Sequence, residues 1–119
     1  MKGAGMVIGS HTQTHRILGQ LSPEQQRWEL EQSKRVIEER IGSSVSALAY
    51  PVGTRGAFDG TTEEIARSLG YTMCFSFYGG VNTPERMTSM NLLRGSADRE
   101  ASLFRTETMM NAKLGRMPY

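Results

Sequence analysis

Strand-like and helical segments alternate along this chain, and this order restricts the fold more than any other feature of the sequence. Residues 6–8 form a short apolar run between two glycines, which is typical of a strand buried on both faces. Further strands are expected over residues 45–50 and 71–77, and a brief one over residues 90–93. The order predicts an α/β fold whose sheet is mostly parallel, either open or as part of a β/α barrel.

The first helix has clear start and stop signals. Ser22-Pro23-Glu24-Gln25 combines a capping serine, a proline at the first helical position and a glutamine that can complete a capping box. Leu30, Ile37 and Ile41 then lie on one stripe, and Gly42 ends the segment. We therefore expect a helix of about five turns, with a solvated outer face rich in Glu and Arg.

Two shorter helices are expected further along. Thr61-Thr62-Glu63-Glu64 is a second capping-box start, and Gly70 marks the stop of that helix. Residues 98–114 have apolar side chains at helical spacing and predict a helical tail.

Composition excludes several classes of protein. The 119 residues contain 14 Lys and Arg against 12 Asp and Glu, and no basic run with interleaved aromatic residues indicates a nucleic-acid partner. The apolar runs are too short for a transmembrane segment, and no signal peptide opens the sequence. Cys74 is the single cysteine, and its apolar neighbours predict a buried side chain. The cellular compartment stays open.

The two histidines of the chain, His11 and His15, directly follow the first strand-like run. An i, i+4 pair lies on one side of a helical turn, close enough for one metal ion to bind both imidazoles. Pairs at this spacing also occur on solvated helices that bind no metal. The pair is therefore a candidate metal site whose neighbours must be considered.

A second feature follows the next strand, where Tyr50-Pro51-Val52-Gly53 predicts a tight turn. Consecutive parallel strands are usually neighbours, and their carboxyl ends open on one face. The histidines and this turn should therefore lie side by side. A metal ion beside a backbone N–H suits the hydrolysis of an acyl group. Alternatively, the proline simply ends the strand.

These residues also resemble a known family. Ser10-His11-Thr12-Gln13-Thr14-His15, then Ala49-Tyr50-Pro51-Val52-Gly53, and then Ala66-Arg67-Ser68-Leu69-Gly70-Tyr71 are similar to the polysaccharide deacetylases of carbohydrate esterase family 4, the NodB-homology domain. The resemblance covers residues 3–95. It implies a partial or distorted (β/α) barrel and a divalent metal, most often zinc, with cobalt or nickel as alternatives. The implied reaction removes N-acetyl groups from an amino-sugar polysaccharide that is chitin-like, peptidoglycan or poly-N-acetylglucosamine.

The resemblance also implies roles for individual residues. His11 and His15 would be metal ligands, and Thr12 would brace the loop between them. Val52 would lend its backbone N–H to an oxyanion hole. Tyr50 and Pro51 would shape that wall of the site, with Gly53 as structural support.

The chain departs from the family pattern at three places. The aspartate pair that supplies the general base and the third metal ligand should precede the histidines, but Asp59 and Asp98 are the only aspartates and both follow them. Ala49 stands where many relatives have an arginine, and no third histidine is present to act as a general acid. We therefore expect residues 1–119 to be a single incomplete domain, with residues 96–119 as its tail.

Two other functions are compatible with this pattern. The chain could be a non-catalytic carbohydrate-binding remnant that holds sugar through Tyr50, Phe58 or Trp28, or an inactive fragment. An incomplete barrel would expose a sheet edge and favour self-association. Full-length relatives generally act outside the cytoplasm, but the sequence names neither the compartment nor the polymer.

Overall fold

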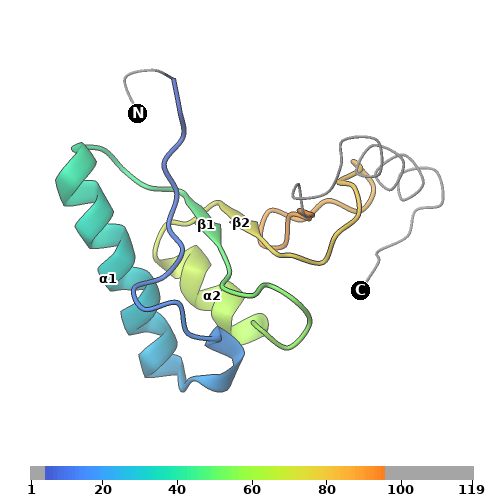
Figure 1. The fold of residues 1–119 in the computed structure, drawn as a ribbon, viewed down its shortest axis with the longest axis horizontal. Coiled ribbons are helices and arrows are strands. Elements are labelled where there is room, and N and C mark those ends of the chain that lie inside the picture. Colours follow the sequence, from blue (N-terminus) through green and yellow to red (C-terminus); the bar gives the residue numbers. More distant parts are fainter. Residues whose placement is uncertain (1–4, 96–119) are drawn as a thin grey trace.

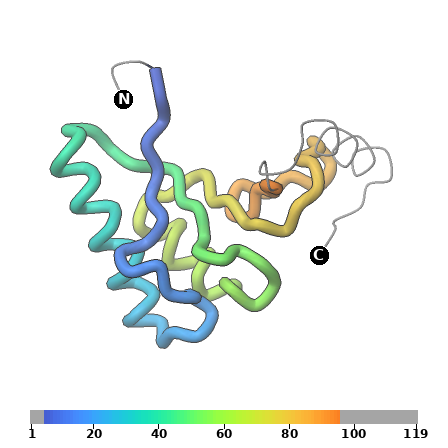
Figure 2. Tube along the Cα trace, in the orientation of Figure 1, coloured from blue at the N-terminus to red at the C-terminus, as the bar shows by residue number. Residues whose placement is uncertain are grey.

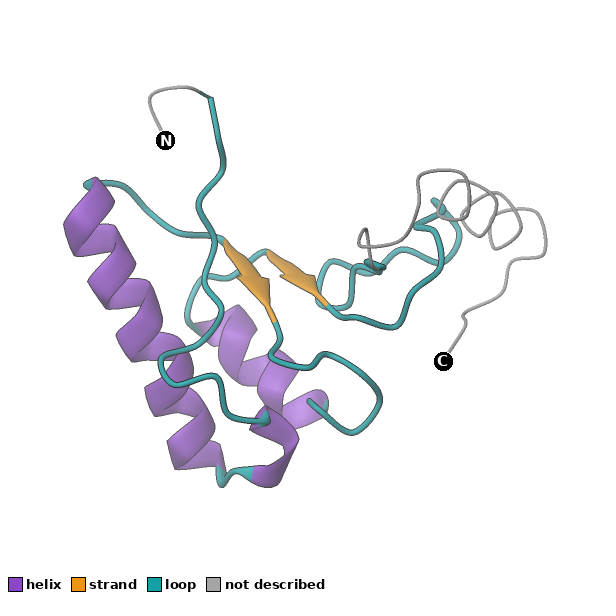
Figure 3. Ribbon diagram, in the orientation of Figure 1, coloured by secondary structure: helices purple, strands orange, loops and turns teal. Residues whose placement is uncertain are grey.

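A computed structural model describes residues 5–95 of the chain and shows two layers, a pair of helices packed on a small parallel sheet (Figure 1). A 3₁₀ helix, Leu18–Gln20, leads into α1, Pro23–Ile41. Strand β1, Ala47–Ala49, precedes α2, Gly60–Ser68, and strand β2, Met73–Phe75, follows it. From α1 to β2 the helices and strands therefore alternate as the sequence predicts (Figure 3).

The sheet is parallel and places consecutive segments side by side. Strands β1 and β2 pair with Leu48 opposite Cys74. Two isolated parallel bridges extend this pair, from Ser10 to Leu48 on one side and from Phe75 to Leu92 on the other. The amino-terminal segment thus runs along β1, as the tube in Figure 2 shows. Residues 5–95 form an open sheet, so the barrel stays a prediction.

The strand expected over residues 6–8, buried on both faces, is wrong. Met6 and Val7 are 56% and 78% exposed, and the segment first joins the sheet at Ser10. The Ser10 N–H donates to the Ala47 carbonyl at 2.8 Å, and the Ala49 N–H donates to the Ser10 carbonyl at 2.9 Å. No part of residues 5–95 covers Met6 and Val7, so an apolar sequence alone does not bury them. The strand expected over 90–93 is likewise reduced to the bridge at Leu92.

Helix α1 begins and ends where its sequence signals predict. The Ser22 hydroxyl accepts from the Gln25 N–H, the Gln25 side chain accepts from the Ser22 N–H, and Gly42 ends the helix with φ at 71°. Helix α2 starts slightly earlier than expected, because Asp59 is its capping residue. The Asp59 carboxylate accepts from the Thr62 N–H at 2.9 Å and Thr62 completes the capping box, so the box opens at Asp59 and not at Thr61 as expected.

The core lies between the helices and one face of the sheet. Leu48 and Cys74 point toward the helices and are fully buried among residues such as Leu30 and Ala66. The burial predicted for Cys74 is confirmed. Because side chains alternate along a strand, the neighbours of Leu48 and Cys74 on β1 and β2 face away from the helices. That opposite face contains the pocket described below.

Two predictions concern parts of the chain beyond this core. The helix expected over 98–114, within the tail 96–119, lies outside the described residues. Between residues 5 and 95, no helix is both long and apolar enough to cross a membrane.

Candidate metal and active site

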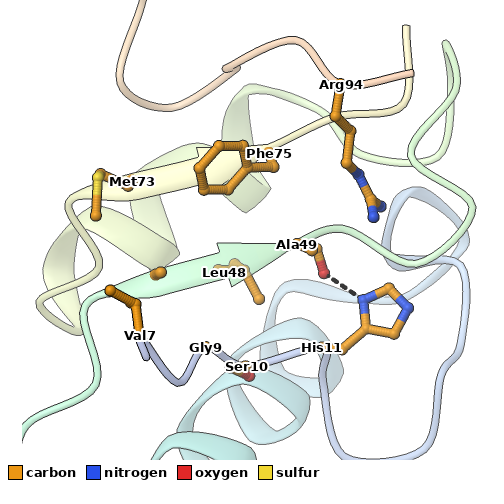
Figure 4. A pocket seen from close by; sticks show the side chains of 10 residues that line it. Val7, Gly9, Ser10, His11, Leu48, Ala49, Met73, Phe75 and Arg94 are labelled. Carbon is orange, nitrogen blue, oxygen red and sulfur yellow. Dashed lines mark hydrogen bonds between the residues drawn. The ribbon is translucent and has the colours of Figure 1, made fainter. Parts of the chain in front are cut away.

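The two histidines lie together beside the end of β1. The rings of His11 and His15 have centroids 4.7 Å apart and meet edge to face. The Nδ1 atom of His11 lies 2.7 Å from the Ala49 carbonyl oxygen. A carbonyl oxygen can only accept, so Nδ1 carries the hydrogen and the Nε2 lone pair of the neutral ring is left for a metal ion. Figure 4 shows this bond at the edge of the pocket.

The histidines meet through a loop and not through a helical turn, which corrects the geometry expected from their spacing. Thr12 and His15 both have φ in the left-handed region, at 65° and 62°. The Thr12 hydroxyl accepts from the His15 N–H at 3.1 Å, and the buried Ser10 hydroxyl accepts from the Thr12 N–H at 3.3 Å. These bonds close the loop, so both rings emerge on the same side.

Backbone strain gathers at this site. Among residues 5–95, Thr12, His15 and Val52 are the non-glycine residues with positive φ. Such a conformation costs on the order of 1–3 kcal/mol per residue and persists only where the surroundings enforce it. All three belong to the histidine loop or to the turn after β1. Strain is therefore confined to the two segments in which the sequence placed the candidate site.

The turn after β1 is anchored in the core by the side chain of Tyr50. This side chain is fully buried, its hydroxyl donates to the Met90 carbonyl at 2.8 Å, and its ring stacks on Phe58 with centroids 4.0 Å apart. Burial raises the pKa of Tyr50 well above its usual range. Tyr50 and Phe58 are therefore core residues, and the idea that they hold a sugar by stacking is wrong. Trp28 is half exposed and keeps that role as a prediction.

Val52 and Gly53 form the outer part of the turn. Val52 is 46% exposed with φ at 63°, and no acceptor for its N–H lies within residues 5–95. Gly53 has φ at 73°, and its carbonyl accepts from the Phe77 N–H at 2.8 Å. A Cβ atom on Gly53 would lie 2.7 Å from that Phe77 nitrogen, so only glycine fits. Pro51, between Tyr50 and Val52, is buried.

A pocket of about 570 Å³ opens on the face of the sheet away from the helices (Figure 4). Its walls are mainly apolar, and His11 and Arg94 supply its charged or titratable groups. The lining residues are Val7, Gly9, Ser10, His11, Ala47, Leu48, Ala49, Met73, Phe75 and Arg94. One imidazole of the candidate metal site therefore borders a cavity large enough for a small ligand.

Arg94 is a residue of this site that the sequence did not indicate. Its Nε donates to the Ser76 carbonyl at 2.9 Å and its Nη2 donates to the Tyr50 carbonyl at 3.2 Å. Partial burial lowers the pKa of its guanidinium. The guanidinium thus lies at the end of β1 and lines the same pocket as Ala49. The only sequence signal was a lone cation after the short run 90–93.

Glu29 is the second residue that sequence reasoning missed. It lies on α1 in the face expected to be solvated, yet it is 2% exposed, and that expectation is wrong at this position. Its carboxylate accepts three hydrogen bonds from the histidine loop. Nothing in the helical periodicity distinguishes Glu29 from its exposed neighbour Glu31.

The imidazoles of His11 and His15 supply some of the ligands that a divalent metal needs. Imidazole nitrogens are good zinc, cobalt and nickel ligands, and His11 has the fixed tautomer that ligation requires. A catalytic zinc usually has three protein ligands and an open position for water. Over residues 5–95, no group of three or more His, Cys, Asp or Glu side chains could hold a metal. These residues therefore offer a two-histidine portion of such a site.

The open parallel sheet and its two packed helices place this chain among the α/β proteins, and comparison with known proteins names the family. The polysaccharide deacetylase family model matches residues 1–74, so this chain belongs to the polysaccharide deacetylase family. YxkH of Bacillus subtilis, which its name assigns to the same enzymes, is 29% identical over 101 residues, covering 84% of this chain and 35% of YxkH.

Solved structures agree with this assignment. The deacetylase PplD of Streptococcus pyogenes, in complex with acetate, is 28% identical with a TM-score of 0.78, over 91% of this chain and 46% of PplD. BC0361, a polysaccharide deacetylase from Bacillus cereus, has the same fold with a TM-score of 0.71 and 22% identity, over 89% of this chain and 33% of BC0361. The chain therefore spans less than half the length of these relatives.

Proposed function

We propose that this chain contributes the histidine pair of a metal-dependent N-deacetylase that acts on an acetylated amino-sugar polysaccharide. The observation that supports this best is the His11–Ala49 hydrogen bond, because it leaves Nε2 of His11 available beside the ring of His15. Membership of the polysaccharide deacetylase family supplies the reaction class. In this proposal His11 and His15 are the metal ligands and zinc is the first candidate.

A bound divalent ion would polarise the acetyl carbonyl and lower the pKa of a water molecule. Residues of this chain would stabilise the charge that develops on the substrate and would position the metal ligands. The Val52 N–H would donate to the oxygen that becomes negative, and its left-handed backbone holds the N–H outside the ladder of β1. Thr12 would keep the two imidazoles in place through its bond to His15.

Arg94 would add positive charge at the same end of the pocket. Acetate, the product of deacetylation, is an anion, and the PplD structure was solved in complex with it. A guanidinium held by the Ser76 and Tyr50 carbonyls is well placed to attract such a product or a carboxylate that completes the site. The general base and third metal ligand are proposed to come from residues outside 5–95.

Metal binding tests the first part of this proposal. Wild-type protein, His11→Ala and His15→Ala would be titrated with Co²⁺ and Zn²⁺ by calorimetry and by Co²⁺ absorption. We expect each substitution to weaken binding at least about tenfold, because it removes one of two imidazole ligands. Gln13→Ala is the matched control, since Gln13 is exposed and lies between the histidines. Binding that both histidine substitutions leave unchanged would overturn the site.

Acetate release tests the reaction. The wild-type chain would be incubated with N-acetylglucosamine oligomers and a divalent metal, alone and joined to the amino-terminal part of PplD. We expect release from the joined protein and its loss on His15→Ala. Oligomer binding without acetate release in either form would favour the carbohydrate-binding remnant. Neither binding nor release would favour the inactive fragment.

A further inference from the structure

The loop between the histidines is held from one side by a single buried carboxylate. Oε2 of Glu29 accepts from the N–H groups of Gln13 and Thr14 at 3.0 and 2.8 Å. Oε1 accepts from the Thr14 hydroxyl at 2.5 Å. All three donors belong to the residues that separate His11 from His15.

Glu29 has no cationic partner in the described part of the chain. The ion pairs found over residues 5–95 join Lys34 to Glu38 and Arg35 to Glu39, both further along α1. A carboxylate that is 2% exposed requires compensation for the water it has lost. Within residues 5–95 the compensation comes from the three bonds to the loop, so the loop and the charge hold each other in place.

The loop needs such an anchor. Thr12 and His15 have left-handed backbones, a conformation that non-glycine residues adopt only when contacts impose it. The Gln13 and Thr14 N–H groups lie between these two strained residues and point at one carboxylate. Releasing them would let Thr12 and His15 relax toward ordinary φ values and would move the two imidazoles apart.

We infer that Glu29 is a positioning residue for the metal-binding loop, acting through the backbone of Gln13 and Thr14 and not by ligating the ion. This inference rests on the metal-ligand role proposed for His11 and His15. Glu29 orients ligands as outer-shell groups do in metal sites, where their removal usually weakens metal binding about 10- to 100-fold.

Glu29→Gln tests this role with little change in shape. The amide keeps one oxygen acceptor for the two N–H groups, but its N–H₂ group faces the Thr14 hydroxyl, which must then accept instead of donate. The negative charge that strengthens all three bonds is lost. We expect Co²⁺ affinity to fall at least about tenfold while the far-ultraviolet circular dichroism of the helices stays unchanged. Glu31→Gln removes the same charge from an exposed position on the same helix and should change affinity less than about twofold.

A second measurement does not depend on metal. Hydrogen exchange of the Gln13 and Thr14 amides, followed by NMR in metal-free protein, should accelerate at least about tenfold in Glu29→Gln and remain unchanged in Glu31→Gln. If Glu29→Gln fails to fold, Thr14→Val removes only the hydroxyl bond and should weaken Co²⁺ binding several-fold with the fold retained.

The outcomes separate this inference from the proposed function. Equal metal affinities of the wild type, Glu29→Gln and Thr14→Val would overturn the positioning role of Glu29. The histidine site itself would not be affected by that result. Metal binding that is insensitive to His11→Ala and His15→Ala would overturn both, even if amide exchange responds to Glu29→Gln. Weakened Co²⁺ binding together with faster amide exchange would support both.

Discussion

The Nδ1 atom of His11 donates to the backbone carbonyl of Ala49 at 2.7 Å, and this bond joins the histidine loop to the end of β1. Because the acceptor is a backbone atom of a neighbouring strand, the imidazole orientation follows from the pairing of Ser10 with Leu48. The parallel sheet thus determines which ring nitrogen faces a ligand.

This bond predicts the tautomer of His11. When the His11 ring is neutral, long-range ¹H–¹⁵N NMR should show a hydrogen on Nδ1 and a lone pair on Nε2. Added Zn²⁺ should then shift the Nε2 resonance of His11. His15→Ala should leave the tautomer of His11 unchanged, because Ala49 and not His15 sets it. A neutral ring with its hydrogen on Nε2 would contradict the geometry.

Gly53→Ala should destabilise the protein by about 2 kcal/mol or more, because a left-handed alanine is strained and its Cβ would collide with backbone. The collision is with the Phe77 nitrogen, 2.7 Å from the added atom, whose N–H donates to the Gly53 carbonyl. Gly60→Ala is the control, since a Cβ there meets nothing within 4 Å and lies at the start of α2. Urea unfolding of both variants would measure the difference. Equal stabilities would show that the turn is not constrained.

Local signals predicted the helices well. The capping box at Ser22 and the stop at Gly42 involve residues close in sequence, so the bounds of α1 could be read directly. The meeting of the histidines with the turn after β1 was also predictable, because neighbouring parallel strands end at the same edge. What the spacing could not supply was the loop conformation, which depends on left-handed backbone at Thr12 and His15.

The residues that were missed act over long sequence distances. Glu29 is buried only because the histidine loop folds back onto α1, and Arg94 reaches the site only through the carbonyls of Tyr50 and Ser76. Val7 was expected to be buried, yet it is exposed because no described segment covers it. Burial is set by the partner segments, and a local pattern does not identify those partners.

Alkaline pH should destabilise the folded chain through Tyr71. Its hydroxyl donates to the Leu30 carbonyl at 2.8 Å, and burial raises its pKa from 10.0 to about 12. Between these values the unfolded chain loses the proton and the folded chain keeps it, so stability is complete below pH 10 and falls as pH rises toward 12. In urea unfolding, the free energy of unfolding should fall between pH 9 and pH 11 by about 1 kcal/mol less in Tyr71→Phe than in the wild type. At neutral pH the substitution should lower stability, because the bond to Leu30 is lost. If the free energy of unfolding of Tyr71→Phe falls as much between pH 9 and pH 11 as that of the wild type, groups other than Tyr71 cause the alkaline destabilisation.

The pocket face of the sheet should promote self-association. Val7 and Met73 are 78% and 39% exposed on the apolar wall of this pocket, and a sheet face of this kind is normally covered in a folded protein. We expect sedimentation velocity to show larger species as concentration rises, and Met73→Glu to shift the protein toward the monomer by placing a charge in the contact. Met87→Glu is the control, because Met87 is 57% exposed and lies outside the pocket lining. A wild-type chain that stays monomeric at every concentration, or equal effects of both substitutions, would show that this face does not mediate association.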